Sequence, residues 1–170
     1  VASRYYDAAK KFNLDHVVRI TGDAILCDEY MLEKAIDTQI TKGTDVIFMK
    51  NMPYGTAKEV FSLRAIEAIT KYSAKPENTE YLEWFLENSR NFKIDYIRSN
   101  YKFDKKIRLT LDFKEDLLQL NHIFKAFKSK KEFSLKDVLN YLKKNKKVVN
   151  INCHLKPKFN RNEINTELFI

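Results

Sequence analysis

The sequence has 170 residues, of which 44% are hydrophobic and 13% are aromatic, so the chain can bury one core and is most simply a single domain. No run of about 18 apolar residues occurs, so we expect no membrane-spanning helix, no membrane partner and a cytoplasmic location. The formal net charge of +8 is uneven, since residues 121–170 carry 12 Lys and Arg against 4 Asp and Glu, and residues 1–120 carry 19 of each kind.

Apolar residues at helical spacing alternate along the chain with short β-branched runs. The spacing predicts helices over 2–13, 28–42, 63–73, 78–89, 113–127 and 133–144, and extended strands over 16–20, 45–50, 58–63, 93–97 and 106–112. Asp28 is the expected N-cap of the second helix, and Gly43 its stop. This alternation predicts an α/β layered domain with a largely parallel sheet.

The basic C-terminal part begins with a well-marked helix start. Ser134 and Asp137 form a capping-box pattern, and Phe133 and Val138 fit a hydrophobic staple. The simplest interpretation of the lysines that follow is a solvent-exposed helix face. The alternative is a surface that binds nucleic acid or an anionic membrane. We favour the first and expect no nucleic-acid partner, because single-strand binding requires interleaved exposed aromatic residues. We expect Leu135, Val138, Leu139 and Leu142 to be buried and Lys136, Lys143 and Lys144 to be exposed.

Two aspartates follow strands in similar surroundings. "RITGD" at 19–23 and "RLTLD" at 108–112 both place Arg, Thr and Asp at alternate positions, so the three side chains share one face of an extended segment. In open α/β sheets the ligand crevice lies beyond the carboxyl ends of the strands. Asp23 and Asp112 are therefore candidates to hold a hard divalent ion such as Mg²⁺ beside substrate phosphates. The structural alternative for each is a helix N-cap or turn residue.

Six segments, in this order, resemble the cytidylyltransferases of surface-polysaccharide synthesis. That group contains the spore coat polysaccharide protein F type and relatives of the CMP-Kdo and acylneuraminate synthetases. The segments are "RYYDAAKKF", "VVRITGD", "YGTAKEVFSLRAIEAI", "ENTEYLEWF", "IRLTLDFKEDL" and "FSLKDVLNYLKKN". The resemblance covers nearly the whole sequence and implies a Rossmann-like, GT-A-like three-layer nucleotidyltransferase sheet.

The resemblance implies transfer of CMP from CTP to an acidic sugar, with release of pyrophosphate. It assigns Asp23 and Asp112 to Mg²⁺ and to catalysis, and it gives Arg19, Glu59 and Arg108 as candidates for substrate binding. The arginines are as readily interpreted as solvent-facing or paired, and Glu59 as the partner of a nearby lysine. Ala24, Ile25, Ala57 and Lys58 depart from the commoner family pattern, which leaves the identity of the sugar open.

The resemblance also implies a chain that is truncated at its N-terminus, since such enzymes begin with a strand and a basic, glycine-containing loop that binds CTP. We therefore expect residues 1–128 to form part of the catalytic core, and 129–170 to add a helix and tail to the same domain. The chain alone is expected to be inactive and to expose a sheet edge that favours a homodimer.

Two other functions stay open at this stage. One is a non-catalytic binding module that uses the basic C-terminal part. The other is a related glycosyltransferase that binds a nucleotide-sugar, although the sequence has no D-x-D motif.

Overall fold

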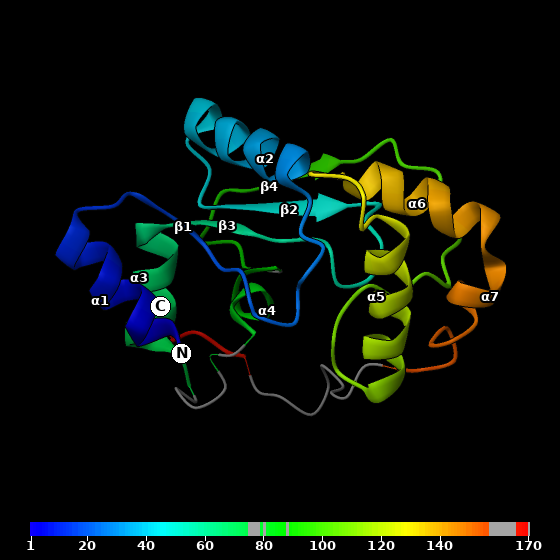
Figure 1. Ribbon diagram of the computed structural model, residues 1–170. Coiled ribbons are helices and arrows are strands. Elements are labelled where there is room, and N and C mark those ends of the chain that lie inside the picture. The colour runs from blue at the N-terminus through cyan, green and yellow to red at the C-terminus, as the bar shows by residue number, and fades with distance from the viewer. Residues whose placement is uncertain (75–78, 80, 88, 157–165, 170) are drawn as a thin grey trace.

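The structure is a computed structural model that describes residues 1–74, 79, 81–87, 89–156 and 166–169 (Figure 1). Its described helices are α1 (Ala2–Phe12), α2 (Glu29–Lys42), α3 (Leu63–Tyr72), α4 (Leu82–Leu86), α5 (Lys114–Ala126), α6 (Leu135–Lys144) and α7 (Lys146–Val149). Its strands are β1 (His16–Val18), β2 (Val46–Lys50), β3 (Val60–Ser62) and β4 (Ile94–Arg98). Within this described part, no helix is long and apolar enough to cross a membrane.

The four strands form one mixed sheet in the order β1-β3-β2-β4. The expectation of a largely parallel sheet was wrong as regards pairing: β3 lies antiparallel to both β1 and β2, and only β2 and β4 pair in parallel. The reason is that β3 enters the sheet between β1 and β2 in the reverse direction. β1, β2 and β4 nevertheless run the same way, so their carboxyl ends lie at one edge of the sheet.

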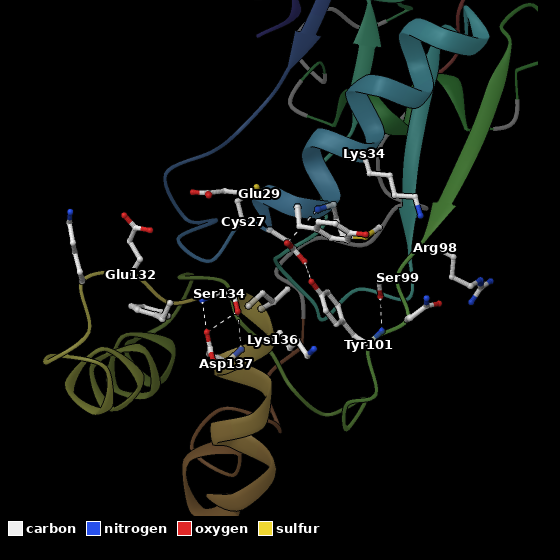
Figure 2. Close-up of a pocket in the computed structure, with 17 residues that line it drawn as sticks. Cys27, Glu29, Lys34, Arg98, Ser99, Tyr101, Glu132, Ser134, Lys136 and Asp137 are labelled. Carbon is white, nitrogen blue, oxygen red and sulfur yellow. Dashed lines mark hydrogen bonds between the residues drawn. The ribbon is translucent and has the colours of Figure 1, made fainter.

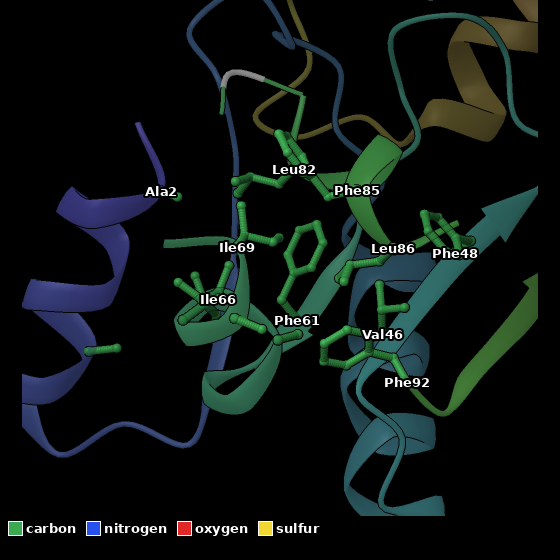
Figure 3. Packing of buried hydrophobic residues seen from close by; sticks show 14 residues of the cluster. Ala2, Val46, Phe48, Phe61, Ile66, Ile69, Leu82, Phe85, Leu86 and Phe92 are labelled. Carbon is green, nitrogen blue, oxygen red and sulfur yellow. The ribbon is translucent and has the colours of Figure 1, made fainter. Parts of the chain in front are cut away.

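Helices cover both faces of the sheet, as the period-two alternation of β2 requires. Val46 and Phe48 belong to a buried cluster with side chains of α1, α3 and α4. Ile47 and Met49 belong to a second cluster with side chains of α2. Figure 3 shows the ring of Phe61, from the middle strand β3, packed among side chains of α3 and α4. The layers are therefore helix, sheet and helix, and the expectation of an α/β layered domain is confirmed.

A third buried cluster lies beyond the carboxyl end of β2, where Figure 1 shows α5, α6 and α7. It joins Leu109, α5, α6 and α7, with Leu142 fully buried. The expected burial of the apolar stripe of α6 is confirmed, as is the exposure of its three lysines. The division at 128/129 stays a prediction, and this cluster contains residues from both sides of it.

The predicted helix caps agree closely with the structure. The Asp28 side chain accepts a hydrogen bond from the Met31 backbone N–H, and Gly43 ends α2 with a left-handed φ of 56°. Ser134 and Asp137 form the expected capping box at the start of α6. The helix predicted over 78–89 is shorter, since α4 spans Leu82–Leu86; positions 78, 80 and 88, and 157–165 and 170 of the tail, lie outside the described residues.

The strand predicted over 106–112 was wrong. Only Arg108 makes a bridge, parallel to Tyr54. Beyond it, the segment bonds to single loop residues: the Leu109 N–H donates to the Tyr54 carbonyl (2.8 Å), and the Leu111 N–H to the Asp23 carbonyl (3.0 Å). Among the residues that the structure describes, no regular strand lies beside it to continue a ladder, so the segment joins two loops at the edge of the sheet.

Candidate active site

The segments of Asp23 and Asp112 meet at the edge where β1, β2 and β4 end. The Leu111 N–H bonds to the Asp23 carbonyl oxygen, and the Thr110 hydroxyl donates to the Asp23 carboxylate at 3.1 Å. Asp112 directly follows this junction. The structure therefore brings together the backbone segments that carry the two aspartates, which are 89 positions apart in the sequence.

A tight turn at Gly55 holds the Thr110 segment in place. Gly55 has φ of 92°, and a Cβ at this position would lie 2.7 Å from both the backbone N and the Cβ of Thr110. The preceding residue, Tyr54, accepts the hydrogen bond from Leu109. Since only glycine combines this φ with so close an approach, the turn "YG" is required for the position of Thr110 beside Asp23.

Arg108 is enclosed between two carboxylates. Its side chain is 5% exposed, its Nε donates to Asp116 at 2.9 Å, and its Nη2 donates to Asp112 at 2.5 Å and to Asp116 at 3.2 Å. The guanidinium also lies over the ring of Tyr54, at 4.9 Å from the centroid. Of the alternatives that the sequence left open, this geometry matches a paired arginine, which orients Asp112.

Asp116 is the fully buried anchor of this arrangement. Its carboxylate accepts hydrogen bonds from the backbone N–H groups of Asp112 and Phe113 at the start of α5, and from the Asn152 amide. Burial raises the pKa of Asp116, but the bond from Arg108 and these amide donors outweigh it and hold the pKa below its ordinary value. Asp116 is therefore an anion, and it fixes Arg108 and the turn that carries Asp112.

Asp23 is also held as an anion. Burial raises its pKa, whereas hydrogen bonds from Thr21, its own backbone N–H and Thr110, together with the charge of Lys58, lower it, and the net pKa lies below the ordinary value. The carboxylate is partly exposed. An ionised, partly exposed carboxylate is the kind of oxygen donor that a hard cation prefers.

Glu59 lies in a separate group of charges close to this junction. Burial and the negative charge of Glu83 raise the pKa of Glu59 to about 7, against the lowering influence of Lys58 and Arg19. The pKa of Glu83, on α4, is likewise raised by burial. The Arg19 Nε is buried without a hydrogen-bond partner among the described residues. Arg19 and Glu59 thus lie in one charged group, and the Nε–H of Arg19 is a donor without an acceptor among the described residues.

The side chains at this junction are of the type that binds magnesium, because carboxylate oxygens are preferred Mg²⁺ ligands. The described residues contain no group of three or more His, Cys, Asp and Glu side chains that could hold a metal, but Mg²⁺ is commonly bound through one or two carboxylates plus substrate phosphates. Asp23 and Asp112 are the candidates for such a pair. In each, one oxygen accepts the bond from Thr110 or Arg108, which orients the carboxylate.

The sequence analysis did not identify three residues as parts of this site: Thr110, Glu83 and Asp116. Thr110 had been noted only as part of the repeated Arg-Thr-Asp pattern. Asp116 was detectable as an acid in the first turn of a predicted helix, four positions after Asp112, where it can cap the helix N-terminus. Glu83 carried no local signal, since only the tertiary fold places α4 near Glu59.

Comparisons with known proteins agree with this fold. A solved structure of a cytidylyltransferase from Leptospira borgpetersenii matches with a TM-score of 0.79 and 28% identity, over 93% of this chain and 67% of that one. The chain matches no protein-family model.

Among curated proteins, the spore coat polysaccharide biosynthesis protein SpsF of Bacillus subtilis is 21% identical over 148 residues, or 85% of this chain and 62% of SpsF. An uncharacterized protein of Methanocaldococcus jannaschii is 29% identical over 163 residues, or 93% of this chain and 65% of that protein. The chain thus spans less than two thirds of the length of these curated relatives.

Proposed function

We propose that this chain is a cytidylyltransferase, which is supported by its similarity in fold and sequence to a cytidylyltransferase and to SpsF. It would transfer CMP from CTP to an acidic sugar, with release of pyrophosphate. The product would serve surface-polysaccharide biosynthesis in the cytoplasm. The finding that SpsF is a relative supports the biosynthetic setting.

The observation that carries the proposal is the junction of Asp23, Thr110 and Asp112 at the sheet edge. The segments of two aspartates meet there, and each carboxylate is oriented by its own donor: Asp23 by Thr110 at 3.1 Å and Asp112 by Arg108 at 2.5 Å. Three strands end at this edge, where open α/β sheets bind their ligands. A pair of oriented carboxylates suits the binding of a nucleotide with its metal.

The proposed reaction is attack of the sugar's anomeric hydroxyl on the α-phosphate of CTP. Bound Mg²⁺ would supply neutralisation of charge on the phosphates. Asp23 and Asp112 would hold it, and Arg108 with Asp116 would keep Asp112 in position. No nucleophilic side chain is required, because positioning and electrostatic stabilisation supply the rate in phosphoryl and nucleotidyl transfer.

The charged group around Glu59 is proposed to receive the acidic sugar. The buried, unpartnered Nε of Arg19 is a donor for the sugar carboxylate, and Glu59 can accept from a hydroxyl. Arg108, in contrast, makes its contacts to Asp112 and Asp116, so we assign it to positioning rather than to direct substrate contact.

We further propose that the 170 residues alone bind CTP weakly and do not turn it over. A triphosphate requires clustered backbone donors, and the three glycines, Gly22, Gly43 and Gly55, are isolated from one another in the sequence.

Calorimetric titration with CTP and Mg²⁺, together with a pyrophosphate-release assay over a panel of acidic sugars, tests both statements. We expect weak, Mg²⁺-dependent binding that is lost in Asp23→Asn and kept in Asp37→Asn, an exposed aspartate on α2. CTP binding that is unaffected by Asp23→Asn would contradict the proposed site. Pyrophosphate release by the chain alone would support the transfer and refute the expected inactivity.

A further inference from the structure

A cleft of about 1170 Å³ separates the start of α6 from the start of α2. Figure 2 shows Glu29 of α2 and Ser134 of α6 on opposite sides of it. The helical unit of α5, α6 and α7 therefore does not pack against α2 at this place. The unit contacts the candidate active site elsewhere, through a buried asparagine, Asn152, in the turn after α7.

Asn152 is fully buried and contacts two residues of the candidate site. Its side-chain nitrogen donates to Asp116 Oδ1 at 2.8 Å and to the Arg108 carbonyl oxygen at 3.3 Å. Asp116 Oδ1 is the same oxygen that accepts a hydrogen bond from Arg108 Nε at 2.9 Å. One side chain from the turn after α7 thus contacts both the backbone of Arg108 and its carboxylate partner.

Gln119, one turn after Asp116 on α5, fixes the orientation of the Asn152 amide. Its side-chain nitrogen donates to Asn152 Oδ1 at 2.6 Å and to the Val148 carbonyl oxygen of α7 at 3.3 Å, and the Asn152 nitrogen donates back to Gln119 Oε1 at 3.1 Å. A carboxylate and a carbonyl only accept hydrogen bonds. Reversing the Asn152 amide would place its oxygen against the acceptors of Asp116 and Arg108, so Gln119 holds the donor of Asn152 toward them.

These contacts continue to the candidate metal ligand Asp112. Asp116 Oδ2 accepts hydrogen bonds from the backbone N–H groups of Asp112 and Phe113, at 2.9 and 3.0 Å. Arg108 Nη2 donates to the Asp112 carboxylate. The hydrogen-bond partners of a metal ligand set its orientation and tune its affinity for the metal. Movement of Asp116 or Arg108 would therefore change the position of Asp112.

We propose that Asn152 is a positioning residue of the reaction centre, which holds Asp116 and Arg108 in the arrangement that orients the Asp112 carboxylate. The inference rests on the proposed function, in which Asp112 binds the metal. It makes the turn after α7 part of the reaction centre, although Asn152 follows Asp112 by 40 positions in the sequence. The sequence analysis expected only an added helix and tail from residues 129–170.

The first test requires no substrate or metal. In the ¹⁵N-labelled chain, Asn152→Ala should shift the amide resonances of Asp112 and Phe113, because their N–H groups donate to Asp116. Asn150→Ala is the matched control, since it replaces an exposed asparagine at the end of α7, and it should leave both resonances in place. If both resonances also stay in place in Asn152→Ala, the proposal is overturned.

The second test is the affinity for Mn²⁺ in the presence of CTP, measured from the broadening of the amide resonances of residues 21–23. Asn152→Ala should weaken this affinity about tenfold, the lower end of what the hydrogen-bond partners of metal ligands contribute. Leu142→Ala removes a fully buried side chain of α6 that takes no part in these hydrogen bonds, so the folded variant should keep the affinity. An equal loss in both variants would show that Asn152 is only structural and would overturn the proposal.

A double variant distinguishes failure of this inference from failure of the proposed function. If Asn152 acts through Asp112, Asn152→Ala should have no further effect on the affinity in the Asp112→Asn chain. A further tenfold loss there would overturn the proposal. Failure of the proposed function gives a different result, because the broadening in the parent chain would then be absent or unaffected by Asp23→Asn. In that case the amide shifts of the first test still decide whether Asn152 holds the segment of Asp112.

Discussion

The most informative single substitution is Gly55→Ala, because it perturbs the candidate site without removing a charged or catalytic group. Alanine at φ of 92° adopts a backbone conformation that costs about 1–2 kcal/mol. Its Cβ would also lie 2.7 Å from the Thr110 backbone N. Relieving such a contact requires a backbone shift, and overpacking of this kind costs about 1–3 kcal/mol.

Together these terms predict a loss of about 3 kcal/mol in the free energy of unfolding. For a chain of 170 residues, that loss corresponds to a fall in Tm on the order of 10 °C. Urea unfolding followed by circular dichroism measures it. Because Thr110 must move, its hydrogen bond to Asp23 should be lost as well, and the amide resonances of 21–23 should shift.

Gly22→Ala is the matched control. A Cβ there meets nothing within 4 Å, and its φ lies outside the left-handed range, so its stability should stay within about 0.5 kcal/mol of the wild type. If Gly55→Ala were as stable as Gly22→Ala, the turn would not hold the Thr110 segment, and our account of how the site is positioned would be refuted.

Three further predictions follow from the burial and pairing of other residues. Arg108→Ala leaves the buried Asp116 without its cation and should cost about 3–5 kcal/mol in urea unfolding; a loss below about 1 kcal/mol would show that the pair is not structural. Glu59 has a folded pKa of about 7 against an ordinary value of 4.5, so its protonated form stabilises the fold below pH 4.5, and that contribution is lost as the pH rises through 7. Glu59→Gln should therefore reduce the fall in stability between pH 5 and pH 8, and an unchanged pH profile would contradict the burial of its charge. Leu142→Ala should cost about 2–5 kcal/mol, whereas Leu118→Ala, which is 51% exposed, should cost less than about 0.5 kcal/mol; similar losses in thermal melting would contradict the third buried cluster.

Local signals in the sequence were sufficient for most helices. Asp28, Gly43 and Ser134 mark helix ends through side-chain and backbone chemistry that acts within a few residues, and the structure places each cap as expected. The apolar stripe of α6 follows from the same 3.6-residue period.

Long-range pairing could not be predicted in the same way. No residue pattern within "KEVFSL" indicates that β3 enters the sheet antiparallel between β1 and β2. The direction of a strand depends on the path of the loops that connect it to its neighbours. Likewise, "KIRLTLD" has the alternation of a strand, but its partners are the loop residues Tyr54 and Asp23. The convergence of Asp23 and Asp112 was reached from the repeated pattern, whereas the pairing of Arg108 with Asp116 required the fold.

The most direct test of the proposed reaction centre is the position of a paramagnetic ion bound with nucleotide. Mn²⁺ replaces Mg²⁺ at oxygen ligands and broadens the NMR resonances of nearby nuclei, so it can be added with CTP to the ¹⁵N-labelled chain. We predict broadening centred on residues 21–23 and 110–112, abolished by Asp23→Asn and retained in Asp37→Asn. Broadening centred elsewhere, or unchanged by Asp23→Asn, would contradict the assignment of Asp23 and Asp112 as the site that holds the metal and the nucleotide.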